Sequence, residues 1–590
     1  MSNPIPIASM RPYIGALLCA LCTVLSAHAG EDTLPPAELM RGMEGYGLSV
    51  FQGVQIDTFG VEILGVMEGA IGPGNDLILV RLSGANLEHT GIIRGMSGSP
   101  VYINGRLIGA IAYGWSYAKD PIGGVTPIGP MIDVAQRQRL AESAQPTRQS
   151  IDFSPPRWIE GADVPQRATL ERLAMPVALA GFSGMASTVL QQALNPLGME
   201  AVIGPGGQRT EAVDVPVTPG AGLGVQLISG DRSATAVGTL TWTDGERFVG
   251  FGHPMMHIGA TDMPATSVYI HQVIPSQISS FKLGSTIRPF GTVHQDRLAG
   301  IGGRIGPAPD MVPVTVDIAS SAASIQNRFA VMRHRDLTPA LVRSVLLSAM
   351  EAHEKLSGDA ALELRATLAL SDGRRVEYEQ FYSGPSAALI ASIEAVQPLV
   401  AMAQSPFVGL DVDSVYIAAD VRETLTQAHI VGMRLPAARL HIGQRYEAEV
   451  TLQPYRGESI QQRIAFRLPD DTPPGPISIR VSSGETARQA ERSRNPGASV
   501  PRSADDLLKL VQQPGRTDEL VLEIAQPQSG LAVHGRAFPS LPPSARSVLE
   551  SESSAGYLSS VSERVLVRVR QSTSHALSGE HAVSAVAIPH

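Results

Sequence analysis

The sequence predicts a mostly β protein, because short apolar runs alternate with turn residues along most of its length. The 590 residues include 58 Gly and 44 Pro, and this abundance favours turns over long helices. At roughly 150 residues per domain, the length predicts three or four domains. A helix bundle or a coiled coil is therefore not expected.

The charge balance argues against one class of partner. Asp and Glu number 55 against 46 Lys and Arg, for a formal net charge of −9, and no segment forms a basic block. Nucleic acids and anionic membrane surfaces are bound through clustered positive charge. We therefore expect neither as a partner.

Residues 1–29 have the composition of a signal peptide. Arg11 supplies a positive charge, residues 14–25 are apolar, and Ala27-His28-Ala29 offers small residues around a cleavage site. Cleavage after Ala29 would leave an exported protein, periplasmic or extracellular.

The mature chain is expected to lack both an anchor and thiol chemistry. No later apolar run approaches the ~20 residues that cross a bilayer, so we expect no transmembrane anchor. Cys19 and Cys22 are the two cysteines of the sequence, and both lie in the signal. Disulfides, a cysteine nucleophile and cysteine-based metal sites are thereby excluded.

Short strands are predicted through the first third of the chain. Residues 61–66 and 76–82 are apolar runs of strand length. Asn104-Gly105 separates two further runs, at 100–103 and 106–111. It predicts a hairpin, because both turn residues must accept positive φ.

A second β region is predicted from about 170 to 310, after a polar connector at about 135–168. It contains a strand at 236–242, a turn at Thr243-Asp244-Gly245 and a strand at 247–251.

The second half of the chain is predicted to contain helices as well as strands. Thr338-Pro339 predicts a helix start, with the helix running to about Leu356, and a second helix is expected from Pro385 to about Gln404. A hairpin is expected around Ser371-Asp372-Gly373. The expected divisions are an α+β module at 311–404, a β-sandwich-like module at 405–484, a polar linker at 485–505 and a β-rich, partly irregular region at 506–590.

The strongest chemical signal is Gly95-Met96-Ser97-Gly98-Ser99-Pro100. A serine between glycines in a tight turn can expose its hydroxyl, and the amides of Gly95 and Ser97 can converge on one oxyanion. An ordinary Gly/Ser turn is the alternative. The α/β-hydrolase elbow fits poorly, because a hairpin follows where that motif needs a helix. A serine between strands, ahead of a hairpin, is typical of a chymotrypsin-like double β-barrel.

A serine nucleophile needs a base, and His253 is better placed than His89. His253 ends a predicted strand between Gly252 and Pro254, whereas His89 lies in a polar stretch expected to be a surface loop. A satisfied core histidine is the alternative for His253. His253 and His257 as metal ligands are disfavoured, because Pro254 opposes a helix and no acidic residue lies between them. We expect no metal and no cofactor.

Together these segments resemble the SpoIVB serine peptidases. Residues 93–101 with 104–110 are similar to the nucleophile segment of that family, and residues 224–231, 238–241 and 252–253 to its histidine segment. The resemblance covers roughly 37–310. It implies a peptidase domain at 30–310, a trypsin-like pair of β-barrels, Ser97 as nucleophile and His253 as general base.

Two features depart from the family pattern. The serine segment precedes the histidine segment here, as if the barrels were circularly permuted. Met96 stands where trypsin-like enzymes carry an aspartate. Because a triad is defined by geometry, the reversed order does not forbid catalysis.

The third member of a triad is left open. Asp76 begins a predicted buried strand and could orient an imidazole, although a turn residue capping a loop is an equal alternative. Asp262 is the rival, and a Ser–His dyad needs neither. Asp296-Arg297 is interpreted as a surface ion pair.

The combined prediction is an exported serine endopeptidase that hydrolyses a protein or peptide substrate. Its C-terminal modules would position the peptidase or bind an envelope protein. The alternative is a catalytically inactive envelope scaffold that binds proteins or peptides in the barrel cleft. Modules beyond about residue 405 are expected to be autonomous, so that a chain ending near Gln404 stays soluble.

Overall fold

The computed structural model describes most of the chain after the predicted signal. The signal and most of the expected connector lie outside the described residues, which are 32–115, 118–137, 170–182, 184–204, 215–321, 323–353, 358–513, 515–533, 536–538, 542–549 and 558–589.

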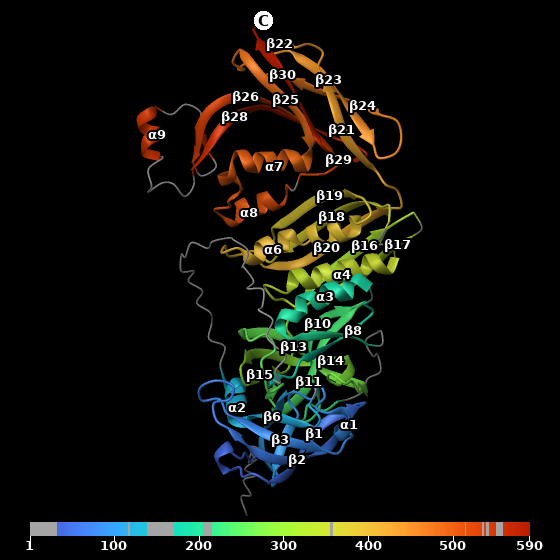
Figure 1. Cartoon of the computed structure of the whole chain (residues 1–590), viewed down its shortest axis with the longest axis vertical. Helices are drawn as coiled ribbons and strands as arrows, with labels where there is room; N and C mark the ends of the chain where they lie inside the picture. The colour runs from blue at the N-terminus through green and yellow to red at the C-terminus, as the bar shows by residue number, and fades with distance from the viewer. Residues whose placement is uncertain are drawn as a thin grey trace, which may run out of the picture.

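The N-terminal region is a closed six-stranded antiparallel barrel (Figure 1, blue). Its strands pair in the order β4-β1-β2-β3-β6-β5, and β5 pairs again with β4. Apolar side chains such as Ile63, Val80 and Ile111 fill its interior. The strands are β1 (Glu44–Gln52), β2 (Gln55–Met67), β3 (Leu77–Ser83), β4 (Pro100–Ile103), β5 (Arg106–Gly114) and β6 (Ile122–Pro127).

Local turn chemistry accounts for the β4–β5 hairpin. Asn104 and Gly105 have φ of 49° and 78°, the left-handed values that this dipeptide tolerates better than most. The hairpin predicted from the sequence is therefore confirmed.

A second closed barrel follows, in the order β10-β13-β14-β15-β12-β11, with β11 pairing back to β10. Every pairing in this ring is antiparallel. The predicted double barrel is thus present, with its strands bounded as β10 (Gly222–Gly230), β11 (Ser233–Thr243), β12 (Arg247–Gly250), β13 (Gly259–Ile274), β14 (Phe281–Arg297) and β15 (Gly300–Ile305).

The two barrels share an apolar cluster. Tyr102 and Leu107 of the first barrel pack with Trp242 and Val249 of the second, and α2 (Ile128–Gln136) contributes Met131 to the same cluster. Single β-bridges join Gly53 to Ile270 and Arg94 to Phe281. The second bridge ties the segment before Ser97 to the start of β14.

The second barrel continues into a sheet that crosses the expected boundary at residue 310. β17 pairs with β10, and the order runs on as β16, β20, β18 and β19. α4 (Thr338–His353) begins at the predicted Thr338 and packs on β16 and β17. The remaining bounds are β16 (Val312–Ala319), β17 (Ser324–Val331), β18 (Ala361–Leu370), β19 (Arg375–Ser383) and β20 (Val412–Arg422), with β8 (Met175–Ala180), β9 (Met199–Ile203) and α3 (Gly184–Leu194) at the other end.

The expected division at Gln404 falls inside this sheet. β20 lies between β18 and β16, pairing antiparallel with the first and parallel with the second. The sequence around β20 does not indicate this position, because β20 joins strands that precede it by about 40 and 95 residues in the sequence. Residues 405–422 therefore belong with the α+β module rather than with the sandwich.

The C-terminal region is one two-sheet sandwich rather than two modules and a linker. One sheet has the order β24-β23-β21-β29 and the other β22-β30-β25-β26-β27, with β28 on β26. Strands from both sides of the expected linker share one core. The strands are β21 (Gln427–Arg434), β22 (Arg439–His441), β23 (Arg445–Pro454), β24 (Ile460–Arg467), β25 (Gly475–Ser483), β26 (Glu519–Val533), β27 (Arg536–Phe538), β28 (Leu558–Ser572), β29 (Ala576–Ser578) and β30 (Glu580–Ile588).

The expected linker at 485–505 is largely helical. α7 (Gly484–Arg494) is capped by Ser483, whose hydroxyl accepts from the Thr486 amide, and α8 (Ala504–Val511) begins before the expected linker ends. Arg494 of α7 pairs with the buried Glu523 of β26. The prediction of a linker at 485–505 is wrong, because the polar side chains of this segment find their partners in strands distant in the sequence.

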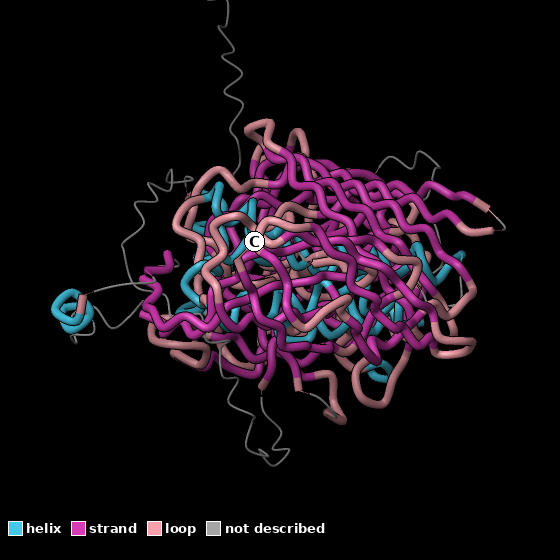
Figure 2. Tube along the Cα trace, turned by 90° about the horizontal axis from the view of Figure 1, so that it is seen from above, coloured by secondary structure: helices cyan, strands magenta, loops and turns pink. Residues whose placement is uncertain are grey.

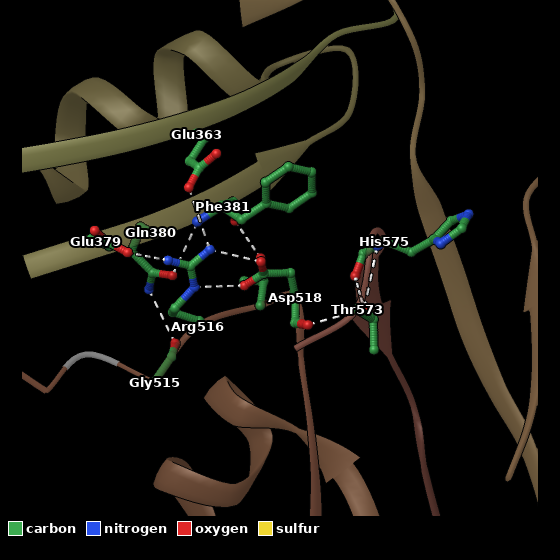
Figure 3. Close-up of polar contacts among 10 residues, drawn as sticks. Glu363, Glu379, Gln380, Phe381, Gly515, Arg516, Asp518, Thr573 and His575 are labelled. Atoms are coloured by element: carbon green, nitrogen blue, oxygen red, sulfur yellow. Dashed lines mark hydrogen bonds and ion pairs between the residues drawn. The ribbon is translucent and has the colours of Figure 1, made fainter. Parts of the chain in front are cut away.

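The sandwich and the first barrel lie at opposite ends of the long axis (Figure 1). Viewed along that axis, strands form most of the trace (Figure 2). An ionic contact joins the sandwich to the central sheet (Figure 3): Arg516 pairs with Asp518 at 2.8 Å, and with Glu379 at 2.6 Å and Glu363 at 3.8 Å on β19 and β18. Hydrogen bonds to Asp518 raise the pKa of Arg516 above its ordinary value.

One helical stretch among the described residues, Ala387–Gln404, has the length and apolar composition to cross a membrane. Half of it is buried inside the protein. It is interrupted between α5 (Ala387–Glu394) and α6 (Gln397–Gln404), and its buried face belongs to the main core. Core helices meet the same criterion.

The position of β20 predicts where the chain tolerates truncation. A chain ending at Gln404 should aggregate, because loss of β20 leaves facing edges of β18 and β16 unpaired. A chain ending at residue 424 keeps β20 and should remain monomeric. Size-exclusion chromatography distinguishes the two. Two soluble products would show that β20 is dispensable, and two aggregated ones would show that the sandwich is integral to the fold.

Candidate active site

Gly95–Ser99 form a tight turn held against both barrels. The amide of Gly98 donates to Ile111 O at 2.8 Å, and that of Ser99 to Met96 O at 2.8 Å. Gly98 has φ of 93°, and a Cβ there would lie 2.0 Å from Thr239 O. A glycine is therefore required at this position by both the conformation and the close approach of β11.

Ser97 is at the centre of this turn and is 1% exposed. Its carbonyl accepts from the Thr239 amide at 2.8 Å, whereas its hydroxyl has no hydrogen-bond partner among the described residues. Among the described residues, the amides of Gly95 and Ser97 also donate to no backbone carbonyl. Buried polar groups are normally satisfied, so an unused hydroxyl beside unused amides is a feature to explain.

The His253 segment follows β12 in an uncommon conformation. Phe251 and Gly252 both have positive φ, 67° and 68°, which turns the chain sharply toward the first barrel. The Gly252 carbonyl accepts from Thr126 Oγ1 at 2.6 Å. A Cβ on Gly252 would lie 3.0 Å from the Cβ of Ala112. The first barrel therefore fixes the backbone that carries His253.

The tautomer of His253 follows from the one hydrogen bond that its ring makes among the described residues. Nδ1 lies 2.9 Å from the carbonyl oxygen of Pro254, and because a carbonyl can only accept, Nδ1 carries the proton. Nε2 then holds a free lone pair, and it is buried without a partner among the described residues. Burial lowers the pKa of His253 to about 4. The imidazole is therefore neutral at pH 7, in the tautomer that can accept a proton at Nε2.

Thr239 and Ile111 bring the two segments together. Thr239 binds Ser97 through its amide, and its carbonyl accepts from the Phe251 amide at 3.3 Å. Ile111 O, the acceptor for Gly98, would lie 3.3 Å from a Cβ on Gly252. Ser97 and His253 thus belong to neighbouring backbone segments, although they are 156 residues apart in sequence.

Neither aspartate considered from the sequence is hydrogen-bonded to His253. Asp76 accepts from the amide of Gly69 at 3.0 Å, in the loop-capping arrangement. Asp262 lies 3.1 Å from Nδ1 of His294. The position at which an acid would meet His253 Nδ1 is taken by the carbonyl of Pro254.

Asp296 has a role that the sequence did not indicate. It is fully buried rather than part of a surface ion pair, and its carboxylate accepts from the amides of Met255 and Met256 at 2.8 and 2.7 Å. Burial raises its pKa, and hydrogen bonds from backbone amides oppose that rise. Asp296 therefore holds the loop that begins at Pro254, beside His253.

The other histidines lie apart from this arrangement. His89 is exposed on the short helix α1 (Leu87–Thr90). His257 is also exposed, whereas His253 is buried, so the two do not face a common metal position. No cluster of three metal-ligating side chains is found in the described part of the chain.

A cavity of about 340 Å³ lies between the barrels, beside Arg94 at the start of the Gly95–Ser99 turn. Its wall includes Ile92 and Arg94 from the segment before Ser97, and residues 276–279 between β13 and β14. Arg172, which lowers the pKa of His253 through its positive charge, lines the same cavity. The cavity therefore borders the segment that leads to Ser97, whereas neither Ser97 nor His253 lines it.

Residues 40–126 match the family described as SpoIVB peptidase S55. The matched segment includes Ser97 and most of the first barrel, and it supports a serine-type peptidase, a hydrolase. The resemblance of the serine segment is thereby confirmed, whereas His253 lies outside the matched residues. No curated protein and no solved structure matches the chain significantly.

The buried neutral His253 predicts a loss of stability in acid. Its pKa is lowered from 6.5 to about 4, so the unfolded state binds more protons between these values and stability falls as the pH drops through this window. Between pH 7 and pH 4.5 the loss should be about 2–3 kcal/mol.

Other groups titrate in the same pH range, so the loss of unfolding free energy in wild-type protein is compared with the loss in His253→Gln. The variant should lose about 2–3 kcal/mol less. Urea unfolding followed by tryptophan fluorescence measures the stability of both proteins. The fluorescence reports on the N-terminal part of the chain, which contains His253, because all three tryptophans precede residue 243. Equal losses in the two proteins would show that His253 is not buried as a neutral base.

Proposed function

We propose that the protein is an exported serine endopeptidase, with Ser97 as nucleophile and His253 as general base. The observation that carries this proposal is that Ser97 Oγ and His253 Nε2 are both buried, on segments that Thr239 joins, and that neither has a hydrogen-bond partner among the described residues, each other included. One is a proton donor and the other, by its tautomer, a proton acceptor. The serine peptidase family match over residues 40–126 supports the same reaction class.

In the first step, Ser97 Oγ attacks the carbonyl carbon of the scissile peptide bond while its proton passes to His253 Nε2. The amides of Gly95 and Ser97 donate to the oxyanion of the tetrahedral intermediate. The imidazolium then gives its proton to the leaving amine as the C–N bond breaks. Water repeats the sequence on the acyl-enzyme and releases the carboxylic acid.

The base is oriented by a backbone carbonyl in this mechanism. The Pro254 carbonyl accepts from Nδ1–H, fixes the tautomer and favours the imidazolium that forms. Asp296 in turn holds the amides of Met255 and Met256. We infer a Ser–His dyad supported by these groups, without Asp76.

The substrate is proposed to be a polypeptide that enters the cavity between the barrels. Export is proposed from the signal-like first 29 residues, which place the substrate in the periplasm or outside the cell. The sandwich at the far end of the molecule is proposed to hold an envelope protein partner. Its distance from the site leaves the cavity free for the substrate.

Burial of the site favours one second candidate. Ser97 and His253 are each only 1% exposed, so a peptide could occupy the cavity without reaching them. A scaffold that binds proteins or peptides in the cleft is therefore the second proposal.

Labelling with a fluorophosphonate probe separates the two proposals. Wild-type protein should be labelled at Ser97, with the site located by mass spectrometry. Ser97→Ala should abolish labelling, and His253→Ala should lower its rate by about 100-fold or more, because members of a catalytic unit fail together.

The matched controls are Ser83→Ala and His429→Ala, which change exposed residues outside the cavity lining and should label like wild type. Absence of labelling in folded wild-type protein, or labelling unchanged in Ser97→Ala, would favour the scaffold.

A further inference from the structure

A fully buried lysine lies directly behind the nucleophile turn. Lys282, on β14, is 1% exposed. Its Nζ donates to Ser49 Oγ at 2.8 Å and to Thr239 Oγ1 at 3.4 Å, and it lies 5.7 Å from the centre of the Phe51 ring. No carboxylate pairs with it among the described residues. Lysine is rarely buried this completely without an acidic partner.

The hydrogen bonds around Lys282 have a defined direction. Thr239 Oγ1 lies 3.0 Å from the carbonyl oxygen of Gly95, and because a carbonyl only accepts, the threonine hydroxyl must donate there. Its lone pairs then accept from Lys282 Nζ, and from Ser99 Oγ at 3.5 Å. The result is a directed line from Lys282 through Thr239 to Gly95.

The lysine also packs against the turn itself. A Cβ on Gly95 would lie 3.2–3.3 Å from three carbons of the Lys282 side chain. The Lys282 amide donates to Arg94 O at 3.0 Å, and the Arg94 amide to Ser280 O at 2.8 Å. Backbone and side chain of β14 therefore both hold residues 94 and 95.

The two peptides that meet at Gly95 matter for the chemistry. The Arg94–Gly95 peptide carries the Gly95 amide, and its carbonyl accepts from the Lys282 amide, whereas the Gly95–Met96 peptide carries the carbonyl that Thr239 binds. Gly95 has φ of 93°, a left-handed value that needs external contacts to fix its orientation. Its amide and that of Ser97 are the proposed oxyanion donors, and such donors act only when aimed at the developing charge.

On the premise that Ser97 is the nucleophile, we propose that Lys282 is a positioning residue of the active site: through Thr239 it holds the Gly95 carbonyl, fixes the Gly95–Met96 peptide between the two donor amides, and so aims those oxyanion-binding amides. The burial that this arrangement requires lowers the pKa of Lys282 to about 7. An apolar side chain would fill the same space without that desolvation cost. The polar link to Thr239 accounts for a lysine at this position.

The test compares labelling kinetics of full-length variants with the same fluorophosphonate probe. Lys282→Met retains most of the side-chain volume and removes the amine. Its maximal labelling rate should fall by about tenfold or more while the probe concentration at half-maximal rate stays unchanged, because the oxyanion donors are misaimed and the cavity is not altered. Its resistance to urea should equal or exceed that of wild type, since a buried charge has been replaced.

Variants of Thr239 test the link itself. Thr239→Val removes the hydroxyl between Lys282 and Gly95 and should slow labelling similarly, whereas Thr239→Ser should restore the rate. Thr235→Val is the matched control: Thr235 is equally buried on β11 and bonds Thr286 of β14 at 2.6 Å, away from the turn. It should lose stability without slowing labelling.

These variants keep the inference falsifiable if Lys282→Met does not fold. Wild-type rates in a folded Lys282→Met, or equal slowing in Thr239→Val and Thr235→Val, would overturn the positioning role while leaving the nucleophile assigned. Wild-type protein that is not labelled at Ser97 would overturn the proposed function instead.

Discussion

The candidate site depends on the close approach of the Gly95–Ser99 turn to a single residue of β11, Thr239. The Thr239 amide donates to the Ser97 carbonyl, and the Thr239 carbonyl accepts from the Phe251 amide. The Thr239 hydroxyl donates to the Gly95 carbonyl. The approach is close enough that a side chain at Gly98 would collide with the Thr239 carbonyl. One strand of the second barrel thus sets the position of the turn from the first barrel and of the segment that leads to His253.

This constraint explains why the order of the two segments along the chain matters little. Each barrel closes on itself through antiparallel pairs, and each contributes one segment to the shared interface. The contacts that join the segments run between barrels, so they require the two barrels to be docked and place no condition on which barrel comes first. Serine before histidine is compatible with the same local geometry.

Features encoded locally were predictable from the sequence. Asn104-Gly105 predicts a hairpin and Thr338-Pro339 a helix start from the preferences of adjacent residues alone, and both predictions are confirmed. The place of β20 was not predictable, because it depends on partners distant in the sequence. The same holds at the site: Ser97 and His253 stand in recognisable glycine-rich segments, whereas Asp296 and Lys282 are defined by burial, which neighbouring residues do not reveal.

The energetics of the site bear on its function. An unsatisfied buried polar group costs about 1–3 kcal/mol, and neither Ser97 Oγ nor His253 Nε2 has a partner in the part of the chain that the structure describes. A buried lysine behind them adds a further desolvation cost. A binding scaffold would be more stable with apolar residues at all three positions. Under the proposed function, this destabilisation is the expected property of a preorganised active site, in which unused hydrogen-bonding capacity is reserved for the reacting peptide.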